Sequence, residues 1–167
     1  NLGSKGNNQK AKEIVDYIKS NFEWNGNNSK YSSQSAKDFF IKKKGNVVDI
    51  NLFMIALLNE AGINTKPLIL STRDHGIIPN DYPFDHFTNY VIAFIDTDSS
   101  FLADGTEELL PYNKLPIRCI NEVGLVVQKK QAPIWIKLSN NANQGLRSTV
   151  FTIESREVRP RICVKYL

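Results

Sequence analysis

The chain has 167 residues, of which 41% are hydrophobic and 23% are charged, and its formal net charge is +4. These values are ordinary for a globular protein, and a chain of this length can bury a core without a disulfide scaffold. No apolar run approaches the roughly 18 residues of a membrane span, so we expect no membrane insertion.

The positive charge is concentrated in residues 1–50, which hold nine lysines and five acidic residues. Lys42, Lys43 and Lys44 form the densest cluster. Such a cluster is either an anion- or nucleic-acid-binding patch or a solvated loop. No aromatic side chains are interleaved with these lysines for stacking on bases. We therefore favour the solvated loop and expect no nucleic-acid partner.

Two helices are predicted near the start of the chain, after a polar arm. Residues 1–9 are almost entirely polar and predict a disordered or extended arm. The apolar residues that follow have helical spacing; they are Ala11, Ile14, Val15, Ile18 and Phe22. Residues 25–35 are rich in Asn, Ser and Gly and predict a loop. Residues 35–43 predict a short helix, with Ala36, Phe39 and Phe40 facing inward.

A third helix is predicted over residues 45–62 (GNVVDINLFMIALLNEAG). Asn46 is a suitable N-cap, and Asp49 three residues later imitates a capping box. Asp49 also places negative charge at the positive end of the helix dipole. Gly62 is a natural stop. Nearly every position between these signals is apolar, which is typical of a helix that is buried on most sides.

After this helix the sequence changes to strand-like segments with short connections. The predicted strands are residues 65–72, 89–96, 101–104, 124–128, 133–138, 148–154 and 161–166. A long polar excursion over residues 73–87 interrupts them. Helices that come first and strands that follow indicate an α+β fold with an antiparallel sheet.

Five motifs occur in order between Gly45 and Gly124: GNVVDINLFMIALLNEAGI, PLILSTRDHG, FTNYVIAF, FLADGT and LPIRCIN. Together they resemble bacterial transglutaminase-like domains, especially those of multidomain envelope proteins. The resemblance implies a papain-like fold in which a buried helix packs on an antiparallel sheet. In active members a cysteine opens this helix, a histidine on the next strand accepts its proton, and an aspartate orients the histidine.

Carried over to this sequence, the cysteine position is Val47, the histidine position is Tyr90 and the aspartate position is Asp104. A slip of one residue would put Asn89 in place of the histidine, and Asn89 is not a base either. Valine has no nucleophilic atom, and tyrosine is a poor base near neutral pH. We therefore expect no thiol-dependent acyl transfer. The phenol of Tyr90 is expected to donate a hydrogen bond to Asp104, because a buried phenol needs an acceptor.

Other residues could supply chemistry. Cys119 and Cys163 are either paired or free, and neither has metal-ligand spacing. His75 and His86 could bind a metal with nearby aspartates, but their spacing fits no defined site, so we expect no metal and no cofactor. Asp49 could pair with Asp104, although a helix-start role explains it better. Further candidate cleft residues beside Asp49 are Trp24, Asn46, His75 and Asn89.

These observations lead to a prediction of three segments: an arm over residues 1–10, a transglutaminase-like domain over residues 11–138, and a C-terminal β segment over residues 139–167. We expect a non-catalytic module that binds a peptide, protein or glycan. The alternatives are a structural spacer of a larger envelope protein and a hydrolase that uses other chemistry. No signal peptide is visible, so the expected periplasmic or envelope location, like the expected other domains of the same polypeptide, follows only from the resemblance.

Overall fold

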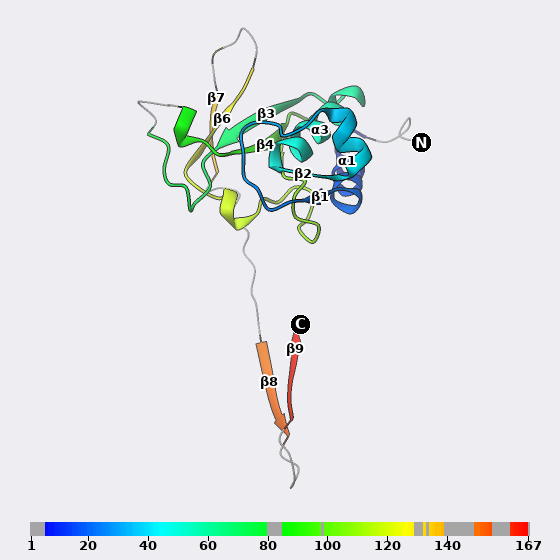
Figure 1. Ribbon diagram of the computed structural model, residues 1–167, viewed down its shortest axis with the longest axis vertical. Coiled ribbons are helices and arrows are strands. Elements are labelled where there is room, and N and C mark those ends of the chain that lie inside the picture. The colour runs from blue at the N-terminus through cyan, green and yellow to red at the C-terminus, as the bar shows by residue number, and fades with distance from the viewer. Residues whose placement is uncertain are drawn as a thin grey trace.

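The structure is a computed structural model that describes residues 6–79, 85–97, 99–128, 132 and 134–138, and the backbone of residues 149–154 and 161–166. Three helices and a five-stranded antiparallel sheet form the body (Figure 1). Residues 1–5, 139–148 and the side chain of Cys163 lie outside the described residues. The predicted α+β fold is confirmed.

Helix α1 (Asn7–Asn21) begins four residues before Ala11, inside the segment that was predicted to be an arm. That prediction is therefore wrong for residues 7–10. Their polar side chains remain exposed or half-buried while the backbone forms the first turn after Gly6. A polar first turn adds no apolar signal to the sequence, which is why the spacing placed the helix start too late. The predicted inner residues Ala11, Ile14, Val15 and Ile18 are buried.

Helix α2 (Ala36–Lys42) is confirmed, and the Ser35 hydroxyl caps it by accepting the N–H of Asp38. Of the three side chains expected inside, only Phe39 is buried, while Phe40 is 49% exposed and Ala36 is exposed. The orientation of Phe40 and Ala36 was thus predicted wrongly. A helix of seven residues buries a narrow stripe, and the Phe39 ring fills it by stacking on Phe22 with centroids 4.9 Å apart.

Helix α3 (Val47–Glu60) is the predicted central helix. The Asn46 side chain accepts hydrogen bonds from the N–H groups of Val48 and Asp49. The Asp49 carboxylate in turn accepts the N–H of Asn46, which completes a capping box. Gly62 has φ +80°, a conformation that favours glycine just after a helix. The sequence therefore fixes both ends of this helix correctly.

The main sheet has the strand order β5-β4-β3-β6-β7, and every neighbouring pair is antiparallel. Its strands are β3 (Thr65–Leu70), β4 (Tyr90–Ile95), β5 (Phe101–Ala103), β6 (Val123–Val126) and β7 (Ile134–Lys137). Two short strands that the sequence did not predict, β1 (Glu23–Trp24) and β2 (Lys44–Gly45), pair in parallel and bring Trp24 next to the start of α3. Strands β8 (Thr149–Glu154) and β9 (Arg161–Tyr166) form a separate antiparallel pair.

The core consists of two clusters that meet along α3. One joins α1 and α3 to the β4–β5 edge of the sheet, and Figure 1 shows α1 and α3 lying together beside β4. The other gathers around the start of α3 and contains Val47, Leu68, Tyr90 and Cys119. The first turn of α3 is thus buried against the sheet, at the place where the resemblance implies the catalytic centre.

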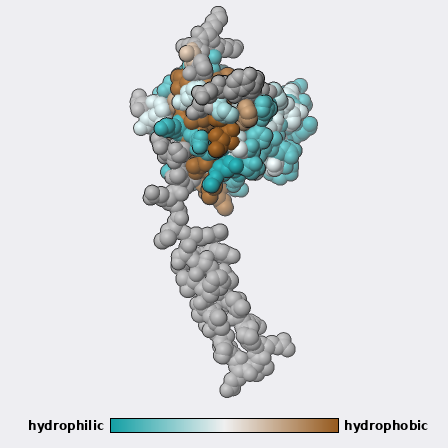
Figure 2. All heavy atoms as spheres, turned by 90° about the vertical axis from the view of Figure 1, so that its left-hand side faces the viewer, coloured by the Kyte–Doolittle hydropathy of each residue, from teal (hydrophilic) through white to brown (hydrophobic). Residues whose placement is uncertain are grey.

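Some apolar residues also reach the surface. Figure 2 shows hydrophobic residues among hydrophilic ones on the face that lies to the left in Figure 1. Among the described residues, large exposed apolar side chains include Ile77, Ile117, Val127 and Ile134. Scattered apolar exposure is normal and does not by itself mark a site. No helix in the described part of the chain is long and apolar enough to cross a membrane.

Candidate functional site

Val47, at the first position of α3, is fully buried. Its N–H donates to the backbone oxygen of Asn27 at 3.3 Å, and its side chain belongs to the same buried cluster as Tyr90 and Cys119. Apolar methyl groups therefore occupy the helix start, and this position offers no nucleophile to a substrate.

Tyr90 begins β4, and Asp104 directly follows the neighbouring strand β5. The Tyr90 hydroxyl donates to Asp104 Oδ2 at 2.8 Å, and both residues are 0% exposed. This is the hydrogen bond that the sequence predicted, and it is confirmed. Asp104 also accepts the N–H of Thr106 at 2.8 Å, and the Cys119 thiol lies 3.7 Å from Oδ2.

Asn51 attaches α3 to this carboxylate. Its side-chain amide donates to the Val91 backbone oxygen at 2.8 Å and lies 3.4 Å from Asp104 Oδ1, while its oxygen accepts the N–H of Gly105 at 2.9 Å. A Cβ on Gly105 would come within 2.8 Å of the Ile50 side chain. Only glycine lets the chain after β5 approach α3 so closely, and this approach places Asp104 beside the helix.

Arg118, in the 3-10 turn η2 (Ile117–Cys119), completes the cluster. Its Nε and Nη2 lie 3.2 and 3.1 Å from the Tyr90 hydroxyl, and Nη2 donates to Thr106 Oγ1 at 2.6 Å. Nη1 donates to the Glu107 carboxylate, and the guanidinium lies 4.3 Å above the Trp24 ring. Sequence reasoning missed this residue, although it lies within the LPIRCIN motif.

Two buried groups of the cluster, the Tyr90 phenol and the Cys119 thiol, have a raised pKa. Burial, reinforced by the Asp104 charge, raises the pKa of Tyr90 above its ordinary value. The same two causes raise the pKa of the Cys119 thiol, which is free of any disulfide. A nucleophilic cysteine needs a lowered pKa, so the surroundings of Cys119 are those of a structural thiol.

Asp49 has a different environment one turn away on α3. Its carboxylate accepts hydrogen bonds from the Ser32 hydroxyl at 2.6 Å, from the Ser33 N–H at 2.9 Å and from the Ser33 hydroxyl at 2.5 Å. Burial alone would raise the pKa of Asp49, but the bonds from Ser32 and Ser33 outweigh it and lower the pKa. Asp49 thus ties the loop before α2 to the start of α3, which fits the helix-start role.

The other predicted candidates serve mainly to connect segments. Asn89 accepts the N–H of Thr72 at 2.9 Å and donates to Thr72 Oγ1 at 2.7 Å, which joins the end of β3 to the start of β4. His75 is exposed, and its Nε2 lies 3.0 Å from the backbone oxygen of His86. Among the described residues no group of three or more His, Cys, Asp or Glu side chains could hold a metal ion.

A groove of about 700 Å³ lies beside the cluster. Trp24, Thr106 and Glu107 line it, and all three also contact Arg118. The other lining residues come from the end of α1, from β1, from the lysine cluster and from the segment after β5; they are Lys19, Ser20, Asn21, Phe22, Glu23, Lys42, Lys43, Lys44 and Glu108. Of the residues predicted to border a cleft, the structure places Trp24 in one.

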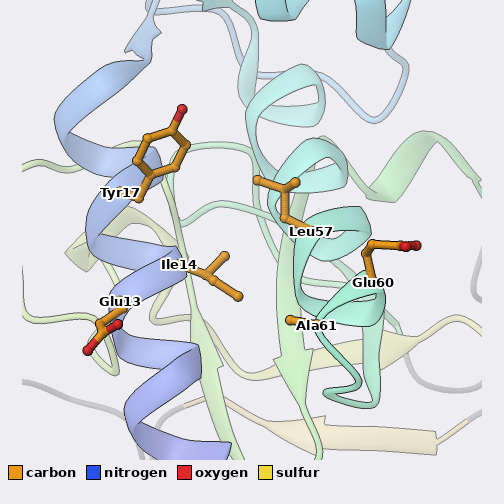
Figure 3. Close-up of a pocket in the computed structure, with 6 residues that line it drawn as sticks. All are labelled: Glu13, Ile14, Tyr17, Leu57, Glu60 and Ala61. Atoms are coloured by element: carbon orange, nitrogen blue, oxygen red, sulfur yellow. The ribbon is translucent and has the colours of Figure 1, made fainter. Parts of the chain in front are cut away.

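A second groove, of about 430 Å³, lies between α1 and α3 and is mainly apolar (Figure 3). Ile14, Tyr17, Leu57 and Ala61 line it together with Glu13 and Glu60. Its α3 residues, Leu57 and Glu60, stand about 15 to 20 Å from Val47 along the helix axis, at a rise of about 1.5 Å per residue. This groove is therefore separate from the cluster around Asp104.

Comparisons with known proteins agree with this architecture. The family model of the transglutaminase-like superfamily matches residues 2–102, which is more than half of the chain. A solved structure from Parabacteroides distasonis, described as a "putative protease", is similar with a TM-score of 0.54 and 14% sequence identity. The alignment covers 82% of this chain and 26% of that one, so this chain spans about a quarter of that protein's length. No curated protein matches the sequence.

Proposed function

Because this chain belongs to the transglutaminase-like superfamily, yet has valine and tyrosine where the resemblance places cysteine and histidine, we propose that it is a non-catalytic member. Its function is to bind a peptide, protein or glycan in the groove beside Trp24. The observation that carries the proposal is the closed cluster around Asp104 with an open groove next to it.

The cluster argues against acyl transfer on chemical grounds. Val47 supplies no nucleophile, and the neutral phenol of Tyr90, which donates a hydrogen bond to Asp104, is too weak a base to take a proton from a thiol. The Cys119 thiol is buried and has a raised pKa, so it does not replace the missing cysteine. Asp104, the one retained member of the catalytic set, serves as the acceptor of a structural network.

The groove argues for binding. Its lining combines Trp24, residues 106–108 and charged residues of both signs, and a space of about 700 Å³ is within the usual range for ligand sites. In an envelope protein, such a groove would hold a neighbouring domain, a peptide or a glycan. The envelope location remains part of the proposal.

A structural spacer is the second candidate, and one observation favours it. Arg118 fills the space over Trp24 and next to Tyr90 with the protein's own side chain. A spacer would need no more than this filled centre. A spacer role does not explain the open groove beside Trp24.

The test measures catalysis and binding separately. Assays of amide hydrolysis and of amine incorporation into a glutaminyl peptide should detect no turnover above a Cys119→Ala control. Turnover that disappears in that control would overturn the proposal. Binding of envelope fragments, meaning stem peptides and glycan strands, should be lost on Trp24→Ala and kept on Trp135→Phe. If no fragment binds, and the natural neighbouring domains bind to Trp24→Ala as well as to the wild type, the spacer hypothesis replaces the binding hypothesis.

A further inference from the structure

The structure points to a more specific ligand, and this inference rests on the binding function proposed above. We propose that the groove beside Trp24 takes a peptide that carries a carboxylate, and that Glu107 occupies the carboxylate position on Arg118 in the unliganded protein. The ligand would displace Glu107 and pair with Nη1 of Arg118 in its place.

Arg118 is held in position by groups other than Glu107. Its Nε and Nη2 contact the Tyr90 hydroxyl, Nη2 also bonds Thr106, and its guanidinium plane lies over Trp24. Tyr90 is itself fixed by Asp104. Nη1 is the guanidinium nitrogen whose hydrogen bond goes to Glu107. A guanidinium that is oriented through Nε and Nη2 and offers Nη1 to the groove can pair with a carboxylate through a charge-assisted hydrogen bond.

Glu107 is the exchangeable partner of this pair. Its side chain is 40% exposed, whereas that of Arg118 is 22% exposed. It lies in the segment after β5, outside any helix or strand, so it can swing away without breaking regular structure. An ion pair at this degree of exposure contributes little stability. Its replacement by an outside carboxylate therefore exchanges one similar contact for another.

The groove supplies the remaining recognition. Lys42, Lys43 and Lys44 line the same groove as Glu107, and their positive charge attracts an acidic chain. Lys44 is paired with Glu23, and the Lys43 ammonium lies 3.8 Å from the centre of the Phe40 ring. The present occupant of the Arg118 edge is a carboxylate on a polypeptide, so the space fits a peptide carboxylate. This assigns a role to the lysine cluster, which the sequence left as either an anion patch or a solvated loop.

The experiment uses Trp24 as its reporter. The chain has two tryptophans, so Trp135→Phe leaves Trp24 as the single indole, directly under the Arg118 guanidinium. Three short peptides are titrated in this background at low salt. One has two internal glutamates and an amidated C-terminus, the second has glutamines at those positions with the same amide, and the third has the glutamines with a free C-terminal carboxylate. The first and third distinguish a side-chain carboxylate from a terminal one.

Two matched variants test the displacement. Glu107→Gln removes the internal competitor and should strengthen binding of a carboxylate peptide by about threefold to tenfold. Glu108 lines the same groove, and Glu108→Gln changes the net charge by the same amount as Glu107→Gln. The Arg118 ion pair, however, is made with Glu107 and not with Glu108. Glu108→Gln should strengthen binding by less than about twofold. Arg118→Lys keeps the charge, loses the fork and should weaken binding at least about tenfold; a thermal melt checks that it folds.

Equal effects of Glu107→Gln and Glu108→Gln would overturn the displacement. Equal binding of the amidated glutamine peptide would overturn the carboxylate requirement while leaving the proposed binding function in place. If none of the three peptides changes Trp24 fluorescence, the carboxylate inference is wrong, and the proposed function is then decided by its own fragment-binding test.

Discussion

Two buried carboxylates near the start of α3, Asp49 and Asp104, are stabilised in different ways. Asp49 is 5% exposed and receives its hydrogen bonds from Asn46 and from the nearby residues Ser32 and Ser33. Asp104 is 0% exposed and receives bonds from β4 and from its own loop, with contacts from α3 and η2. The first is a local cap, and the second is a junction between distant segments.

The difference shows two ways in which a buried carboxylate is kept paired. A cap serves the helix in any member of the fold. A buried carboxylate that is not part of a cap must find a hydrogen-bond donor on another segment, because an unpaired buried charge is costly. Here Tyr90 supplies that donor, and Arg118 closes the network on the groove side.

The largest loss of stability is expected when the hydrogen bonds around Asp104 are broken. Asp104→Ala removes the acceptor of the buried Tyr90 hydroxyl and of the half-buried Thr106 N–H, and should lower the free energy of unfolding by about 3 kcal/mol or more. Chemical denaturation followed by far-ultraviolet circular dichroism measures it. A loss below about 1 kcal/mol would mean that the cluster contributes little to the fold.

Breaking the cap should cost less. Asp49→Ala removes one half of the capping box and the acceptor of the Ser32 and Ser33 hydroxyls, with an expected loss of about 2 kcal/mol in the same assay. Part of this loss is recovered by water, because the loop over residues 32–34 lies near the surface. An effect larger than that of Asp104→Ala would reverse the comparison.

The pH dependence of the free energy of unfolding tests the contribution of the Asp49 carboxylate. The pKa of Asp49 lies below its ordinary value of 3.8, so the folded state favours the charged form more than the unfolded state does. Its contribution is present above that ordinary value and is lost as the pH falls through the lower folded pKa. The stability gap between wild type and Asp49→Asn should therefore shrink as the pH falls below 3.8. A gap that widens on acidification would contradict the assignment.

Tyr90→Phe tests the coupling within the junction. Removing the hydroxyl should cost about 1 kcal/mol by itself. Combined with Asp104→Ala it should add much less than this, because the two groups share one hydrogen bond at 2.8 Å. The matched combination with Asp49→Ala should be additive, since Tyr90 and Asp49 share no hydrogen-bond partner among the described residues. Additivity in both double variants would argue against a connected network.

The smallest loss of stability is expected when a single donor to Asp49 is removed. Ser32→Ala removes one donor to Asp49 Oδ1, but the Ser33 N–H still donates to the same oxygen. We expect a loss of about 0.5 kcal/mol, seen as a small shift of the denaturation midpoint with an unchanged slope. A loss as large as that of Asp49→Ala would show that Ser32 alone holds the loop.

The sequence predicted most of the fold because its signals are local. Asn46, Asp49 and Gly62 mark the ends of α3 by capping chemistry, and the strand segments follow from alternation and turns. The errors were also local in origin. The polar first turn of α1 has no apolar signal, and the seven residues of α2 are too few to show which aromatic ring is buried.

The candidate site was predictable only in part. The resemblance located Val47, Tyr90 and Asp104, and the rule that a buried phenol needs an acceptor predicted the bond between the last two. Nothing in the sequence predicted that Arg118 would lie over Trp24, since these residues are 94 positions apart by their numbers and meet only through the pairing of β1 with β2 and the turn η2.

By itself, the sequence determined both ends of α3, the antiparallel α+β architecture and the absence of a nucleophile at the start of α3, because each depends on a residue's own chemistry or on its nearest neighbours. The tertiary structure alone decided the partners of Asp104, the position of Arg118 and the groove beside it. Hydrogen bonds and packing between distant segments depend on how the elements are placed in space, and spacing along the chain does not encode that placement.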